Sequence, residues 1–277
     1  MMDYKKFLNK KTILPGILVL VVLLVILLVF FLNDKTKSRA NDDADKSPII
    51  IEGERIEENT VSVSENESGS KVDSVMNEIS IPSKEIDWDE LKNTNTDVYA
   101  WVYVPGTDVD YPVLQHPTDD SYYLNHTIEG KKGLPGCIMT ELYNKKDFSD
   151  PLTVIYGHNM RSGEMFASLH MFEDAKEFDG EHYIYVYTEN ESFAYKIFAA
   201  REYTAQHLLA NYDYTEEGIF KSFIDSVFTS GCRVGNINNE IEVQEKDRVL
   251  ALSTCTKDSR DDLRFITFGV LVLEEEN

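Results

Sequence analysis

The chain has 277 residues, which is long enough for one large domain or two small ones with a real core. It carries 27 Lys and Arg against 49 Asp and Glu, a formal net charge of −22. Because most of this surface would repel a phosphate backbone, we exclude nucleic acid as a partner.

The N-terminal region contains a long apolar run, residues 13–32, without a charged or amide side chain. At about 1.5 Å per residue, a helix of that length spans a hydrocarbon core of roughly 30 Å. Four lysines lie in residues 1–12, which predicts a cytoplasmic tail and a single-pass anchor with the remaining chain outside the cell. A cleaved signal peptide is the alternative, but the run is long for one and no small-x-small cleavage site follows it.

Residues 33–82 are predicted to form an acidic stalk or linker. They are rich in acidic residues, Ser and Asn and poor in aromatic residues, so they bury too little apolar area to offset the entropy of ordering. Four apolar residues near the end of this segment fall at helical spacing: Val72, Val75, Met76 and Ile79. A short helix and a fully solvated tail are therefore both open there.

The folded domain is expected to cover residues 83–277. Asp87, with Glu90 three residues later, predicts the start of a short helix. Pro105-Gly106 then predicts a type II turn between two strands. Further strands are expected in the segments CIMTEL, LTVIYG, YIYVYT, FAYKIFAAREYT, RVLALSTC and FITFGVLVL.

Two helical insertions interrupt these strands, one over residues 165–178 and a longer one over residues 215–230. The longer one places six apolar residues on one face, has acids in its first turn and ends at Gly231. Seven or eight short strands with peripheral helices predict a mostly β fold, a closed barrel or a sandwich, rather than a parallel α/β sheet.

The first candidate site lies at the end of a predicted antiparallel hairpin. One strand ends at Cys255 and its partner begins near Arg264, so the two side chains should lie side by side at one rim. A guanidinium there offers a fixed fork of donors to a carbonyl or an oxyanion. A thiol also needs a proton partner, since free cysteine is only a few per cent thiolate at neutral pH.

Among the six histidines, His158 has the most informative position because it follows a strand and a glycine in LTVIYGHNM. The other five are expected to be ordinary surface or packing residues: His116, His126, His170, His182 and His207. The three cysteines show no C-x-x-C pairing, so no zinc ribbon or dithiol motif is predicted. Cys137 is expected to be a core residue, and nothing in the spacing demands that it pair with Cys232.

Several of these motifs together resemble the sortases, the membrane-anchored cysteine transpeptidases of Gram-positive bacteria. The segment ALSTC at 251–255 is similar to the family signature T-L-x-T-C with Ala251 in place of the first threonine, Arg264 enters the last strand, and YGHN spans 156–159. Likeness to class B members lies in PGTDVDYPVLQ, DDSYYLNH and HNMRSGEMFASL, and in the long helix before the cysteine strand. The resemblance covers nearly all of residues 84–273 and implies a sortase-type closed barrel.

The resemblance also implies a mechanism. Cys255 would attack the Thr carbonyl of a C-terminal sorting pentapeptide, His158 would exchange protons with the leaving and incoming amines, and Arg264 would hold the carbonyl or its oxyanion. Ser253 and Leu114 are weaker substrate-binding candidates, with a strand-end hydroxyl and a core leucine as the alternative reading. The expected partners are surface proteins with a sorting signal, a peptidoglycan amine acceptor and the membrane. We expect no cofactor and no metal.

Two further possibilities stay open at this point. A pilus-polymerising sortase would have the same site, whereas a membrane-tethered adhesin or another non-enzymatic β-domain would not need it. An anchored surface protein would end in a sorting motif, an apolar helix and a basic tail. This chain ends in FGVLVLEEEN, so we expect the sorting enzyme rather than its substrate.

Overall fold

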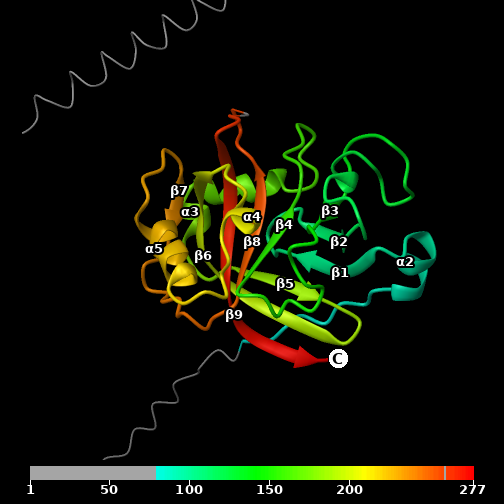
Figure 1. Ribbon diagram of the computed structural model, residues 1–277, viewed down its shortest axis with the longest axis horizontal. Helices are drawn as coiled ribbons and strands as arrows, with labels where there is room; N and C mark the ends of the chain where they lie inside the picture. The colour runs from blue at the N-terminus through cyan, green and yellow to red at the C-terminus, as the bar shows by residue number, and fades with distance from the viewer. Residues whose placement is uncertain (1–78, 259) are drawn as a thin grey trace, which may run out of the picture. The chain divides into compact units, whose positions relative to one another are not determined.

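The computed structural model describes residues 79–258 and 260–277, and Figure 1 shows their arrangement. The predicted cytoplasmic tail and membrane anchor, and nearly all of the predicted stalk, lie outside these residues. Within the described residues, no helix combines the length and the apolarity needed to cross a membrane.

The described residues form a mostly β structure. Its strands are β1 (Val98–Tyr103), β2 (Asp110–Leu114), β3 (Ile138–Met139), β4 (Leu152–Tyr156), β5 (Tyr183–Tyr187), β6 (Glu191–Thr204), β7 (Gly235–Ile237), β8 (Val249–Cys255) and β9 (Leu263–Glu276). Its helices are α2 (Trp88–Thr94), α3 (Ala175–Phe178), α4 (Leu208–Asn211) and α5 (Ile219–Thr229), with 3-10 turns η2 (Tyr122–Leu124) and η3 (Ala167–Glu173). The sequence patterns predicted all of these strands except β7, whose three residues give no periodic signal.

The strands pair in the order β5-β1-β2-β3-β4-β8-β9-β6, and β5 also pairs with β6. Eight strands of the described chain therefore close a barrel, and β7 extends the sheet beside β6. Two of the pairs, β2 with β3 and β4 with β8, are parallel, so the barrel is mixed. The closed barrel, one of the two predicted architectures, is confirmed.

Local signals in the sequence explain several boundaries. The Asp87 side chain accepts a hydrogen bond from the Glu90 amide at 2.9 Å and caps α2, as predicted. In the β1–β2 turn Gly106 has a φ of 80°, and the Thr107 amide donates to the Val104 carbonyl, which is the predicted type II turn.

The helical insertions differ from the predictions. Residues 165–178 form η3 and α3 rather than one helix, because the Asp174 backbone is extended and its side chain caps α3. The longer helix begins at Ile219 instead of residue 215, so Glu216 and Glu217 precede it, and its C-cap is Ser230. Gly218, with a φ of 78°, sits at its N-cap.

Strand β8 is apolar on both faces because each face is covered. Leu250 and Leu252 belong to the cluster inside the barrel, whereas Val249 and Ala251 belong to the cluster beneath α5. The α5 side chains buried in that second cluster are Phe220, Phe223, Ile224 and Val227. Burial of each such side chain stabilises the fold by about 1.5 to 3 kcal/mol. Helix α5 therefore packs on the outer face of the sheet, where its Phe228 stacks on Phe198 of β6 and its Phe223 contacts Phe268 of β9.

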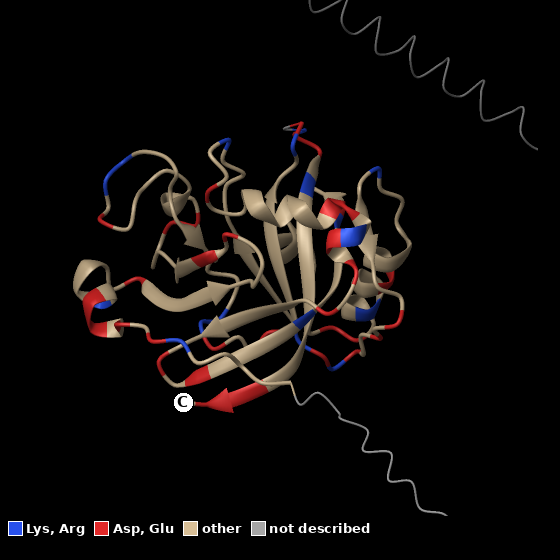
Figure 2. Cartoon of the chain, turned by 180° about the vertical axis from the view of Figure 1, so that it is seen from behind, with Lys and Arg blue, Asp and Glu red and all other residues tan. Residues whose placement is uncertain are grey.

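Acidic residues outnumber basic ones, and Figure 2 marks them on loops, helices and strand ends, including the end of β9, residues 274–276. This distribution leaves the barrel interior apolar.

Candidate active site

The hairpin of β8 and β9 places two candidate residues directly opposite each other. Cys255 and Arg264 are register partners at the open end of this antiparallel pair, as predicted. Cys255 is exposed, whereas the preceding residues of β8 are buried. The thiol therefore sits at the point where the strand leaves the core.

Strand β4 brings His158 to the same end of the sheet. It runs parallel to β8, with Tyr156 opposite Ser253, and the Gly157 amide donates to the Ser253 carbonyl at 3.1 Å. A Cβ at position 157 would lie 2.5 Å from Ile138 Cδ1, so only glycine lets the chain pass here. Because parallel strands end at the same edge, His158 emerges beside the β8 terminus.

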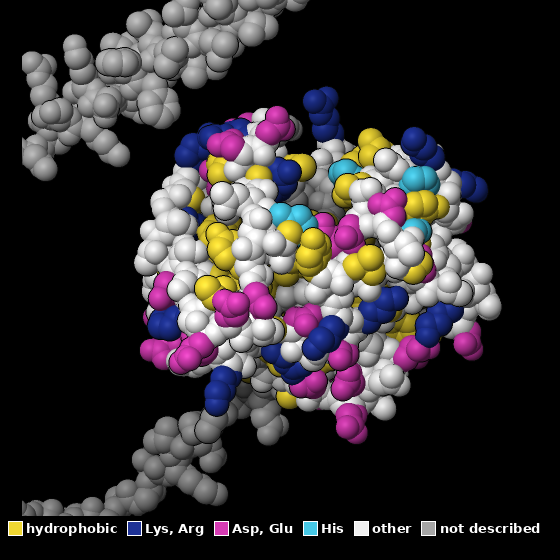
Figure 3. Space-filling view, viewed as in Figure 1, with side chains coloured by type: hydrophobic (Ala, Val, Ile, Leu, Met, Phe, Trp, Pro, Cys, Tyr) yellow, Lys and Arg dark blue, Asp and Glu magenta, His cyan; other side chains and the backbone are white. Residues whose placement is uncertain are grey.

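A cavity of about 280 Å³ opens at this edge. Three neighbouring strands line it with Val154 and Tyr156 of β4, Ser253, Thr254 and Cys255 of β8, and Arg264 and Ile266 of β9. His158 lines the same cavity. In Figure 3, which shows the molecule from the side of Figure 1, hydrophobic and histidine side chains gather beside a hollow in the upper half.

Backbone carbonyls hold two of the candidate side chains. His158 Nε2 lies 2.7 Å from the Leu124 carbonyl oxygen, and Arg264 Nη1 donates to the Leu263 carbonyl at 2.9 Å. Within the described residues, no carboxylate forms an ion pair with Arg264, and its Nε and Nη2 make no hydrogen bond. The guanidinium therefore keeps donors for a ligand in the cavity.

A second thiol lines the cavity but is chemically different. Cys137, just before β3, is 8% exposed, and its Sγ donates to the His126 carbonyl at 3.3 Å. Burial, with a smaller effect of Glu129, raises the pKa of the Cys137 thiol to about 12. It thus keeps its proton at neutral pH. Cys137, Cys232 and Cys255 are all free thiols.

One wall of the cavity carries acidic and imidazole groups that the sequence analysis missed. Asp120, Glu141 and His207 all line it. His207 Nδ1 accepts a hydrogen bond from the Ala210 amide, so in the neutral ring the proton is on Nε2, which lies 2.9 Å from Glu141 Oε2. Burial raises the pKa of Glu141, and the neighbouring His207 opposes that shift. These residues come from three separate segments, so no motif could have predicted their meeting.

The two weaker candidates have different surroundings. Ser253 lines the cavity and is 5% exposed. Leu114 is fully buried and packs with Val98, Tyr123 and Met139, and it is not among the cavity residues. This position agrees with the alternative reading of Leu114 as a core leucine of strand β2.

Residues 102–272 match the family model of the sortase domain. The chain belongs to the sortase family. It is 32% identical over 185 residues to sortase B of Listeria monocytogenes, which covers 66% of this chain and 73% of that protein.

Solved structures agree with this assignment. A class B sortase of Streptococcus pyogenes involved in pilus biogenesis superimposes with a TM-score of 0.59 at 28% identity, covering 68% of this chain and 98% of that one. The Staphylococcus aureus sortase B–substrate complex has the same fold, with a TM-score of 0.57 at 24% identity over 66% of this chain and 83% of that one.

This protein is thus a class B sortase, a cysteine transpeptidase of the family that anchors surface proteins in Gram-positive bacteria. Membership in this family implies a location in the cell envelope. The non-enzymatic alternative, a tethered β-domain that only binds, does not agree with these matches.

Proposed function

We propose that Cys255 is the nucleophile of this sortase, His158 its acid and base, and Arg264 the residue that holds the reacting carbonyl. The observation that carries the proposal is the meeting of three strand ends at one cavity, with Cys255 and Arg264 in register. Cys137 is the only other thiol of the described chain in this cavity, and its raised pKa disfavours it as a nucleophile.

The reaction has two steps. The Cys255 sulfur bonds to the carbonyl carbon of a threonine, the carbon–nitrogen bond breaks, and His158 gives a proton to the departing amine. An acceptor amine then attacks the thioester, loses a proton to His158 and releases the thiolate. In both steps, the free donors of the Arg264 guanidinium would stabilise the oxyanion.

The substrate in this proposal is a C-terminal sorting signal of the form Asn-Pro-x-Thr-Asn/Gly, or similar to Leu-Pro-x-Thr-Gly, cleaved after Thr. The cavity supports a peptide substrate because it combines apolar surface, from Leu124, Met139 and Ile266, with polar groups at its wall. Leu124 is 44% exposed, so the apolar rim remains open to a side chain such as proline or leucine.

The acceptor is proposed to be an amine of peptidoglycan, and residues 13–32 are proposed to anchor the enzyme with its catalytic domain outside the cell. An apolar run of that length in the sequence, preceded by four lysines, supports the anchor. Polymerisation of pilus subunits is the second candidate function. It is favoured by the likeness to the streptococcal class B sortase involved in pilus biogenesis.

A panel of fluorogenic sorting peptides tests the substrate. The full-length protein in detergent micelles is incubated with each peptide, with and without peptidoglycan-derived amines or a lysine-bearing pilin fragment. We expect a product joined through threonine to the peptidoglycan amine. Preferential transfer to the pilin lysine would favour the second candidate, and cleavage at another residue would overturn the proposed motif.

A further inference from the structure

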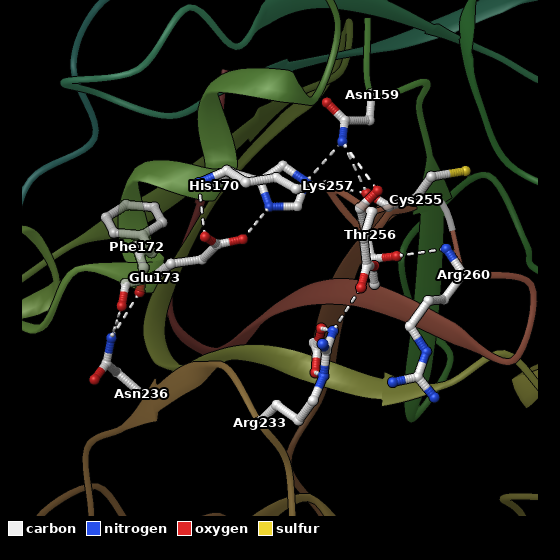
Figure 4. A network of polar contacts seen from close by, with 12 residues as sticks. Asn159, His170, Phe172, Glu173, Arg233, Asn236, Cys255, Thr256, Lys257 and Arg260 are labelled. Atoms are coloured by element: carbon white, nitrogen blue, oxygen red, sulfur yellow. Dashed lines mark hydrogen bonds and ion pairs between the residues drawn. The ribbon is translucent and has the colours of Figure 1, made fainter.

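Two side chains from distant parts of the chain contact the main-chain carbonyl of Cys255. Asn159 Nδ2 lies 3.1 Å and His170 Nε2 lies 3.0 Å from this oxygen (Figure 4). Asn159 belongs to the loop after β4, and His170 belongs to η3. Cys255 is the last residue of β8, so these contacts begin where the strand pairing ends.

His170 is itself held firmly. It is 4% exposed, its ring lies against Phe265 with centroids 4.5 Å apart, and its Nδ1 is 2.6 Å from Glu173 Oε1. The other Glu173 oxygen is 2.6 Å from Lys257 Nζ. Lys257 is two residues beyond Cys255, so the chain that follows the candidate nucleophile is held at two points, the Cys255 carbonyl and the Lys257 side chain.

The position of η3 is fixed from the opposite side. Asn236 of β7 donates through Nδ2 to the Phe172 carbonyl at 2.8 Å and to the Glu173 carbonyl at 3.2 Å (Figure 4). This anchors the turn that carries His170 to the sheet. The residue that contacts the Cys255 carbonyl, His170, therefore lies in a turn that is itself hydrogen-bonded to β7.

The hydrogen-bond chemistry works in either form of the His170 ring. A carboxylate only accepts, so Nδ1 carries a proton toward Glu173. If Nε2 is also protonated, it donates to the Cys255 carbonyl. If it is not, it accepts from Asn159 Nδ2 at 3.0 Å, and the second amide hydrogen of Asn159 still reaches the Cys255 carbonyl.

We propose that His170 and Asn159 are positioning residues that hold the Cys255 main chain and thereby set the thiol relative to His158. Asn159 directly follows His158, so the contact that restrains the Cys255 carbonyl also restrains the chain carrying the acid and base. This inference rests on the proposed catalytic roles of Cys255 and His158. A small displacement of reacting groups is enough to reduce turnover by about 10²-fold.

Substitutions at position 170 separate hydrogen bonding from packing. His170→Phe keeps a ring against Phe265 but removes both polar contacts. His170→Gln places a donor near the Nε2 position, whereas His170→Asn places one near Nδ1 and cannot reach Cys255. With the full-length protein and a cleavable sorting peptide, we expect kcat to fall about 10- to 100-fold in the Phe and Asn variants with KM unchanged. His170→Gln should recover most of this loss.

His182→Phe is the matched control. This histidine also contacts an aromatic ring, that of Phe172, and a backbone carbonyl, that of Asp179, but neither His182 nor these two partners line the cavity. It should keep kcat within about twofold. Asn159→Ala combined with His170→Phe should be less damaging than the product of the single effects, since both side chains act on one oxygen.

The outcomes distinguish this inference from the proposed function. An inactive wild type, or an active Cys255→Ala variant, refutes the catalytic assignment itself. If those behave as proposed and His170→Phe retains its kcat, the positioning role is wrong. Should His170→Phe fail to fold by circular dichroism, the Gln and Asn variants decide, and equal loss in both shows that His170 serves packing alone.

Discussion

Two cysteines from different regions line the same cavity: Cys255 at the end of the β8–β9 hairpin and Cys137 just before β3. At the rim, Cys255 is exposed at a strand end with the Arg264 guanidinium opposite it. At the wall, Cys137 is buried, donates to a carbonyl and has its pKa raised to about 12. A position in the cavity lining is therefore not enough to make a cysteine a nucleophile. In the proposed mechanism, exposure at a strand end opposite the Arg264 guanidinium distinguishes Cys255 from the buried Cys137.

Removing each thiol in turn tests the difference between the two cysteines most directly. Cys255→Ala should reduce peptide cleavage by roughly 10⁴- to 10⁶-fold and abolish the acyl-enzyme, because the covalent step has no other nucleophile. Cys137→Ala should keep most of the turnover. Cleavage assays with mass spectrometry of the intact protein measure both. Persistent acylation of Cys255→Ala would move the nucleophile to another residue.

Alkylation measures the difference in reactivity between the two thiols in the unmutated protein. The Cys137 thiol has a pKa of about 12, against roughly 8.5 for an ordinary cysteine, so its thiolate fraction at pH 8 should be about 10³-fold lower. In native protein, iodoacetamide should modify Cys255 while Cys137 stays unmodified, as peptide mass mapping would show. In urea, both should react.

The same pKa shift has a consequence for stability. A pKa raised in the folded state favours folding fully below roughly pH 8.5, and this contribution is lost as the pH rises toward about 12. Replacing Cys137 by alanine should therefore flatten part of the alkaline decline in the free energy of unfolding. Rapid labelling of Cys137 in native protein at pH 8 would contradict the buried position.

The arginine of the rim gives the next largest effect. Arg264→Lys should lower kcat by about 10²- to 10³-fold, nearly as much as Arg264→Ala, because an ammonium keeps the charge but not the fork of donors. Arg260 is the control, since it lies in the β8–β9 loop and pairs with Asp262 at 2.7 Å. Arg260→Lys should stay within about twofold. If Arg260→Lys were damaging and Arg264→Lys were not, the oxyanion role proposed for Arg264 would be wrong.

Removing the N-terminal segment should have the smallest effect. The described residues, from 79 onward, belong to one compact unit, which contains both Cys255 and Cys137. A fragment beginning at Asp73 should be soluble and cleave sorting peptides with a kcat/KM within about twofold of the full chain, since the deleted segment supplies location rather than chemistry. An insoluble or inactive fragment, compared in the same detergent buffer, would show that the deleted segment supports the fold.

The relation between Cys255 and Arg264 could be predicted from the sequence because it is local. The two residues lie nine positions apart at the ends of one hairpin, and a short loop between two apolar runs sets their register. His158 could be proposed for a similar reason, since a strand followed by glycine marks an edge of the sheet. The type II turn at Gly106 and the cap at Asp87 are likewise local, and both are confirmed.

Other features depended on the tertiary structure. His170 was expected to be an ordinary residue, and its contact with the Cys255 carbonyl joins positions 85 residues apart. Cys137 reaches the cavity only because β3 pairs with β4, and β4 in turn pairs with β8. Leu114 carried a matching motif, yet the pairing of β2 places it in the core. The sequence by itself determined the eight barrel strands and the hairpin that joins Cys255 to Arg264, because strand period and turn chemistry act over a few residues. Barrel closure decided which distant side chains share the cavity, because burial and long-range pairing depend on the whole chain.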